Sequence, residues 1–291
     1  MGIKSYLKSI PAVLSLKRKI WAYFYRPKSN QLLKDVHDIL IQSGTLNLKG
    51  KDNNPLNRFG KKCFSQSDED GISLEIIKRI NLQSGTYAEF GVGDGLECNT
   101  LIFAALGWKG FWVGGQDLAF DYSKSKKFCY LKEWITLDNI NSLVTAGLNK
   151  INSSAVDVVS LDLDGNDLYL IDALLVSGHR PKLFIVEYNG KFPPPIEFSI
   201  KYDPNHQWAT DDYFGASLQS FVTCFAKFGY RLICCNALTG TNAFFIRDDL
   251  MEHFSDIPSD IEDIYIPQRA VYISKYSAGS SVRTVEQIIN S

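Results

Sequence analysis

The residues best placed to do chemistry lie in the stretch "TYAEFGVGDGLECNT", positions 86 to 100. A strand-like run reaches Glu89, and Gly91, Gly93 and Gly95 follow at alternate positions. A carboxylate at a strand end can accept hydrogen bonds from a ligand ammonium group, and glycines let the backbone approach a ligand closely and adopt positive φ. This spacing predicts a strand-to-helix turn that holds a nucleotide-like cofactor. A tight turn without a ligand is the alternative.

A second acidic motif, "LDLDGND" at positions 161 to 167, follows another apolar run. Asp162 and Asp164 are two residues apart in an extended segment and therefore face the same side of a strand. Two neighbouring carboxylates raise each other's pKa unless a cation or hydrogen-bond donors compensate them. The pair therefore predicts either a Mg²⁺ site that also receives a hydroxyl group, with Glu187 of the next strand end nearby, or a general base or orienting pair. A calcium loop is excluded, because Ala173 stands where its bidentate Glu belongs.

The glycine turn does not match the common phosphate-binding motifs. A dinucleotide fingerprint would need a glycine at position 96, which is Leu96. It also needs an acid about 20 residues further on, but the next strand-like run, "GFWVGGQD", ends in Gly114 and Gly115. The Gly-Lys-Ser/Thr of a nucleotide-triphosphate loop is absent from the sequence. A cofactor without phosphate groups is therefore favoured.

Alternating strand-like and helix-like segments must position these motifs. Strands are expected at 86–92, 110–115, 129–136, 156–163 and 182–189, and helices at 67–82, 98–106, 120–127, 138–150, 167–177 and 217–228. The run 229–247 is expected to form a hairpin. The pattern predicts an α/β fold, with a doubly wound, mostly parallel seven-stranded sheet that ends in an antiparallel hairpin. Ligands bind such sheets beyond the carboxyl ends of the strands.

Seven motifs occur in one order over residues 64 to 247 and together resemble the FkbM-like group of class I S-adenosylmethionine (SAM)-dependent methyltransferases. They are "FSQSDEDGI", "EFGVGDGLECNT", "GWKGFWVGG", "VVSLDLDGND", "FIVEYNGKFPP", "YFGASL" and "GTNAFFIR". The resemblance implies a Rossmann-like domain that binds SAM and methylates a hydroxyl of a sugar or glycan-like acceptor. The cofactor-binding residues that it implies are Gln66, Glu69 and Asp70 near the methionine end, and Glu89, Gly91, Gly93, Asp94, Gly95 and Asn99 at the turn. A capping cluster for the following helix is the alternative for Glu69 and Asp70.

One position departs from the family pattern. Class I methyltransferases usually end their second strand with an acid that holds the cofactor ribose, where this chain has Gly114. Gln116 or Asp117, just beyond, is expected to take over that role. Two other functions stay open: a catalytically inactive methyltransferase-like binding or scaffold protein, which the departure favours, and a methyltransferase of a small non-sugar metabolite.

The segment 190–217 is long for a loop and rich in aromatic residues, which predicts a lid over the strand ends rather than disorder. Aromatic faces beside polar side chains suit a polyhydroxylated acceptor. His206 in this segment can deprotonate a hydroxyl near neutral pH. A solvent-exposed histidine with no catalytic role is the alternative. With Asp162, Asp164 and Glu187, His206 completes the predicted catalytic set.

The charge of the chain is unevenly distributed. Residues 1–62 hold thirteen basic and three acidic residues, and the remainder holds eighteen basic and twenty-nine acidic residues. This predicts a basic helical appendage with linker at 1–62, a methyltransferase-like domain at 63–250 and a C-terminal extension at 251–291. The appendage suits either peripheral contact with an anionic membrane or packing on the domain. The sequence contains no nucleic-acid-binding module, so no nucleic-acid partner is expected.

The remaining composition predicts a cytoplasmic protein, with the inner face of the membrane as the alternative location. The six cysteines form no C-x-x-C pair, so reduced thiols are expected rather than a disulfide framework. The N-terminal apolar run "IPAVLSL" contains a proline and precedes further basic residues, unlike a signal peptide. The sequence leaves the oligomeric state open.

Overall fold

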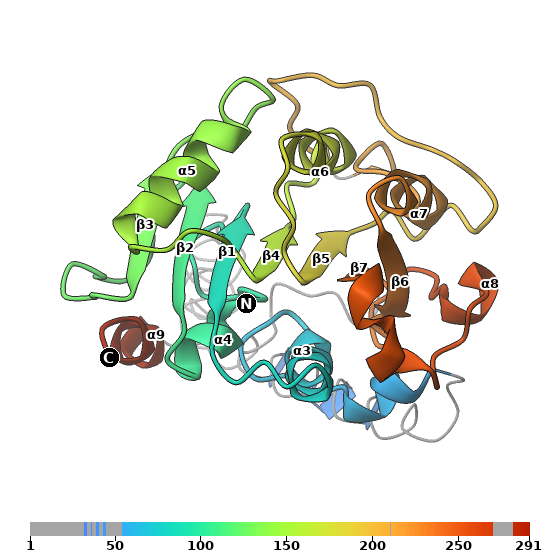
Figure 1. Cartoon of the computed structure of the whole chain (residues 1–291), viewed down its shortest axis with the longest axis horizontal. Helices are drawn as coiled ribbons and strands as arrows, with labels where there is room; N and C mark the ends of the chain where they lie inside the picture. The colour runs from blue at the N-terminus through green and yellow to red at the C-terminus, as the bar shows by residue number, and fades with distance from the viewer. Residues whose placement is uncertain are drawn as a thin grey trace, which may run out of the picture.

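The computed structural model describes residues 54–209, 211–269 and 282–291, with positions 32, 33, 36, 39, 40, 43 and 44. A central sheet carries helices on both of its faces (Figure 1). Most of the predicted basic appendage lies outside these residues, so its contacts stay predictions. No helix in the described part of the chain has the length and apolar character needed to span a bilayer.

Seven strands form the sheet, in the order β3-β2-β1-β4-β5-β7-β6. They are β1 (Thr86–Phe90), β2 (Lys109–Gly114), β3 (Phe128–Lys132), β4 (Val158–Leu161), β5 (Leu183–Glu187), β6 (Tyr230–Cys235) and β7 (Asn242–Arg247). The first five strands pair in parallel, and β7 is antiparallel to both β5 and β6. The strand order and the reversed β7 confirm the predicted class I methyltransferase-like Rossmann fold.

The helices cover the sheet in two layers, each with its own apolar core. In Figure 1, α5 (Ile140–Lys150), α6 (Asp167–Val176) and α7 (Leu218–Ala226) lie on one face, and α3 (Glu69–Arg79), α4 (Leu101–Ala105) and α9 (Val282–Ile289) on the other. Side chains of a strand alternate between faces. Ala88 and Phe90 of β1 therefore pack in the first core, whereas Tyr87 packs in the second. Because Glu89 has the same parity as Tyr87, it faces the layer of α3 and α4.

Short elements complete the chain: η1 (Pro55–Phe59), η2 (Asp248–Phe254) and α8 (Ile261–Ile264). Parts of both terminal segments pack on the central domain. The side-chain amide of Asn54 donates to the carbonyl of Ile233 over 2.7 Å, and Leu56 is fully buried. Val285 of α9 is also fully buried, within the core that α4 shares. The division of the chain at residues 62 and 250 stays a prediction.

The expected polar helix at 120–127 is wrong, because turns and bends connect β2 to β3. The Asp121 carboxylate accepts hydrogen bonds from the amide and the hydroxyl of Ser123. The Ser125 hydroxyl oxygen accepts from the amide of Phe128. These short side-chain bonds to the backbone compete with the bonds of a helix. The other expected helices and strands are present, with ends shifted by a few residues.

Candidate functional site

A cavity of about 550 Å³ opens at the carboxyl ends of the parallel strands. Its walls come from the turn after β1, the ends of β2 and β3, the segment after β4, and the long loop 190–217. The side chains and backbone that line it include Gly91, Gly93, Gln116, Asp162, Asp164 and His206 from the predicted set. Four separate segments therefore bring six predicted residues to one space.

The glycine turn needs its glycines for three different reasons. Gly91, Gly93 and Gly95 have φ of +93°, +54° and +81°, which side chains disfavour. A Cβ on Gly91 would lie 1.6 Å from the carbonyl oxygen of Asp162, so this glycine lets the β1 turn cross the end of β4. A Cβ on Gly95 would lie 2.8 Å from the Phe120 ring, whereas one on Gly93 would meet nothing within 4 Å. Gly93 thus leaves bare backbone at the cavity.

Glu89 fixes the start of α4. Its carboxylate accepts hydrogen bonds from the amides of Asn99 and Thr100, both at 2.9 Å, and from the Thr100 hydroxyl at 2.5 Å. Only 5% of the residue is exposed, and this burial raises the pKa of the carboxyl to about 7 despite the three donors. Glu89 does not line the cavity, and its predicted contact with a cofactor ammonium stays a prediction.

The other predicted residues of the turn also have contacts within the protein. The Asn99 side-chain amide donates to the Ser160 hydroxyl over 3.2 Å, which links the turn to β4. Exposed Asp94 accepts from the amide of Leu96. Neither Asn99 nor Asp94 lines the cavity.

The acidic cluster in the first turn of α3 is buried and bonded to neighbouring donors. Glu69 is fully buried and accepts from the side-chain amides of Asn236 and Asn242. One oxygen of Asp70 accepts from three successive amides, those of residues 63 to 65, and from the Ser65 hydroxyl. The Gln66 carbonyl accepts from Lys62, and none of the predicted Gln66, Glu69 and Asp70 lines the cavity. These bonds tie the start of α3 to the preceding loop and to Asn236 and Asn242, and no side chain of the described residues caps the helix. The cofactor contacts of these residues and the capping alternative both stay predictions.

Gln116 and Asp117 were both expected to replace the missing acid at the end of β2, and the structure places them differently. Gln116 lines the cavity. Asp117 instead pairs with Lys132 of β3 at 2.6 Å and has a side chain 86% exposed. Of the two, only Gln116 is available to a molecule in the cavity.

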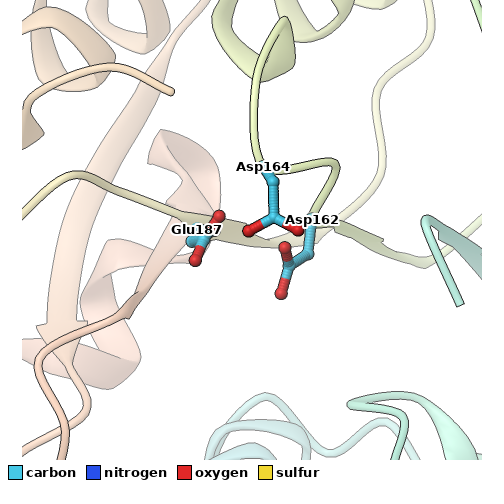
Figure 2. A group of neighbouring side chains, drawn as sticks. All are labelled: Asp162, Asp164 and Glu187. Atoms are coloured by element: carbon cyan, nitrogen blue, oxygen red, sulfur yellow. The ribbon is translucent and has the colours of Figure 1, made fainter. Parts of the chain in front are cut away.

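Asp162, Asp164 and Glu187 converge at the ends of β4 and β5 (Figure 2). One oxygen of each lies within 4.8 Å of the others. Burial and the neighbouring carboxylates raise the pKa values of Asp162 and Glu187 well above their ordinary values. One oxygen of Glu187, Oε2, is buried and has no hydrogen-bond partner among the described residues. Three carboxyl groups this close together favour either a shared proton or a bound cation.

His206 reaches this acidic segment from the long loop. Its Nε2 lies 3.2 Å from the carbonyl oxygen of Asp164. Asn166 anchors the loop, because its side chain donates to the Asp203 carbonyl and accepts from the Asp203 amide. The Trp134 indole donates to the carbonyl of Pro204 over 2.7 Å. The loop therefore lies over the strand ends, as the aromatic composition predicts.

Sequence reasoning missed Glu133 and Trp134, which line the cavity just after β3. Both fall inside the predicted strand 129–136, so they carried no separate signal. The structure ends β3 at Lys132. The rule that ligands bind beyond strand ends, applied to this shorter strand, would have found them.

No family model matches the sequence, and the comparison with curated proteins finds no match. Several solved structures are weakly similar, among them two methyltransferases. One is the MycE methyltransferase of the mycinamycin biosynthetic pathway, in complex with Mg, S-adenosylhomocysteine (SAH) and mycinamycin VI. Its TM-score is 0.32 at 10% identity, over 60% of this chain and 45% of that chain, so the match spans less than half of MycE.

A second is coclaurine N-methyltransferase bound to N-methylheliamine and SAH. Its TM-score is 0.29 at 12% identity, over 78% of this chain and 74% of that chain. Both similarities are weak, and the fold is recognised from the strand order and the direction of β7.

Proposed function

We propose that this protein is a SAM-dependent O-methyltransferase of the FkbM-like group, acting on a hydroxyl of a sugar or glycan-like acceptor. One observation carries the proposal: the glycines Gly91 and Gly93 and the carboxylates Asp162 and Asp164 line the same cavity. A cofactor turn and acceptor-activating acids in one space are what methyl transfer to oxygen requires.

The cavity fits SAM in size and chemistry. Its volume of about 550 Å³ lies within the usual range for small-molecule sites, roughly 300 to 1,000 Å³. Gly93 offers bare backbone to a ligand. SAM supplies a methyl group on a positively charged sulfonium, and an acidic wall suits that charge. The residues that would hold the cofactor here are Gly91, Gly93 and Gln116.

The acceptor hydroxyl must be positioned, and its proton must be removed. Holding two reactants in the correct geometry lowers the barrier, and a positioned base contributes about 10²–10⁴-fold. Asp162 or Asp164 can receive the proton, and His206 lies beside them as a second candidate base. Trp134 and Trp208, which are 52% and 45% exposed, line the cavity with flat apolar faces suited to a sugar ring.

The same carboxylates also suit a divalent cation. Asp162, Asp164 and Glu187 each offer an oxygen, the ligand type that Mg²⁺ prefers. A cation would compensate the crowded negative charge. It would also orient the acceptor hydroxyl and make it more acidic. We therefore include Mg²⁺ as a second component of the proposed enzyme.

The test is methyl transfer from labelled SAM to a panel of sugars and glycans, with and without Mg²⁺. Calorimetry with SAM and SAH comes first. Micromolar binding and labelled sugar are the expected results, and EDTA should abolish labelling while leaving SAH bound. A wild-type protein that fails to bind SAM at millimolar concentration contradicts the enzyme function.

A binding or scaffold protein is the second candidate, and Gly114 at the end of β2 favours it because the usual ribose-binding acid is missing. Such a protein would show no SAM binding. Methylation of small non-sugar metabolites but not of sugars would instead retain the reaction and change the acceptor.

A further inference from the structure

The end of β2 has little room for an acidic side chain. A Cβ on Gly114 would lie 3.1 Å from the Tyr130 hydroxyl oxygen and 3.2 Å from a methyl of Val92. The Tyr130 hydroxyl lies 2.8 Å from the Gly114 carbonyl and 2.5 Å from that of Gln116, and it therefore holds this backbone in place. A carboxylate at position 114 would have to displace these groups.

The next strand brings an acid to the same place. The amide of Glu133 donates to the Gly114 carbonyl over 3.0 Å, so Glu133 lies directly beside the end of β2. Gly115 and Trp134 are also in contact, because a Cβ on Gly115 would lie 3.3 Å from the Trp134 indole. The two segments form one wall of the cavity, which Gly114, Gln116 and Glu133 all line.

The Glu133 carboxylate is free to receive a ligand. It has no hydrogen-bond or ion-pair partner among the residues that the structure describes, and the residue is exposed to the cavity. The adjacent cation, Lys132, is paired with Asp117 instead. A carboxylate can accept two hydrogen bonds at once, which matches the two hydroxyl donors of a ribose.

We propose that Glu133, at the end of β3, recognises the ribose hydroxyls of the cofactor in place of an acid at the end of β2. This inference rests on the proposed SAM-dependent function. Gln116, which follows Gly114 by two residues and lines the same cavity, contributes one further acceptor. In this arrangement the ribose-binding acid follows β3 and not β2, and Gly114 at the end of β2 leaves room for Tyr130.

Calorimetry with SAH and its 2′,3′-dideoxy analogue tests this assignment. The variant Glu133→Gln removes the charge and keeps the shape, and its exposed side chain makes no described bond whose loss would unfold the protein. We expect SAH to bind the variant about 10- to 100-fold more weakly than the wild type, the range for a hydrogen bond to a charged group. The dideoxy analogue should bind both proteins equally.

The matched control is Glu262→Gln, an exposed residue of α8, which lies at the opposite edge of the sheet from β3 (Figure 1). It should bind SAH as the wild type does. Equal SAH affinity of Glu133→Gln and wild type overturns the assignment, and so does an equal loss for SAH and its dideoxy analogue. A wild type that binds no SAH at millimolar concentration instead removes the proposed function itself.

Discussion

Two groups of acids lie near the carboxyl ends of the strands and differ in what their oxygens contact. Glu89 and Asp70 accept hydrogen bonds from backbone amides and hydroxyls that begin a helix or close a turn. Asp162, Asp164 and Glu187 face one another instead. We call these the bonded acids and the crowded acids.

Burial raises the pKa values in both groups, so the pKa alone does not separate structural acids from functional ones. The difference lies in compensation. Donors surround the bonded acids, and removing one of these acids leaves buried amides unpaired. The crowded acids have mainly one another as neighbours: Asp162 and Glu187 share a hydrogen bond, and the repulsion among the three carboxylates destabilises the folded state. Acids that weaken the fold are the better candidates for chemistry.

The largest expected effect is on activity, in Asp162→Asn. We expect methyl transfer to fall by at least about 100-fold, the loss typical of a missing base or orienting group. Thermal stability should stay equal or rise, because one of the crowded charges is gone. Activity with labelled SAM and a melting curve measure the two effects. Activity within twofold of wild type would remove Asp162 from the mechanism.

The control for this variant is Asp157→Asn, just before the opposite end of β4. Asp157 is ion-paired with Lys182 and accepts from the amide of Thr86. This variant should lose stability and retain methyl transfer, the reverse of Asp162→Asn.

The second prediction concerns a bonded acid, Asp70. Asp70→Ala leaves three amides and the Ser65 hydroxyl without their acceptor. We expect unfolding free energy to fall by about 3 kcal/mol, since each unpaired buried donor costs about 1–3 kcal/mol before the site relaxes. Urea denaturation measures the loss. Asp70→Asn retains an acceptor oxygen and should recover part of it; equal stability of Asp70→Ala and wild type would contradict the structural role.

The sequence could predict the sheet because its apolar runs and glycine turn are local signals. Local signals also placed Asp162 at a strand end, but Asp164 lies in the turn after β4 with φ of +54° and not on the strand face that the spacing predicted. They could not show that Glu89 accepts a hydrogen bond from Thr100, or Glu69 one from Asn236, because those donors come from other elements of the fold. Glu133 was missed for the same reason: its proximity to Gly114 depends on the register between β2 and β3.

The third prediction uses the pH dependence of stability. The pKa of Glu89 is raised from an ordinary value of 4.5 to about 7, and that of Asp68 from 3.8 to about 7. The folded state therefore holds protons that the unfolded state releases, and stability must fall as pH rises from about 4.5 to 7 and level off above it. For Glu89 the fall between pH 5 and 7 is on the order of 2 kcal/mol.

Urea denaturation from pH 5 to pH 8 tests this slope in wild type and in Glu89→Gln. The variant lacks the titrating group, so its stability should fall less over the same range, whatever its absolute value. An identical slope in both proteins would show that Glu89 titrates alike in the folded and unfolded states.

The smallest effect is expected where the long loop meets the crowded acids. A Cβ on Gly165 would lie 2.4 Å from the His206 ring. Gly165→Ala must therefore turn this ring away and break its contact with the Asp164 carbonyl. We expect methyl transfer to fall about threefold to tenfold, with a stability change below about 1 kcal/mol, as is usual for a substitution that only moves an accessible side chain.

Gly178→Ala provides the opposite case and separates strain from positioning. Gly178 has φ of +88° and no atom within 4 Å of an added Cβ, so alanine there costs stability of about 1 kcal/mol and leaves activity unchanged. If Gly165→Ala acts only through His206, it should have no further effect in a His206→Ala background, because the displaced ring is already absent. Additive losses in the double variant would mean that Gly165 is needed by the acidic segment itself, and that the histidine merely packs against it.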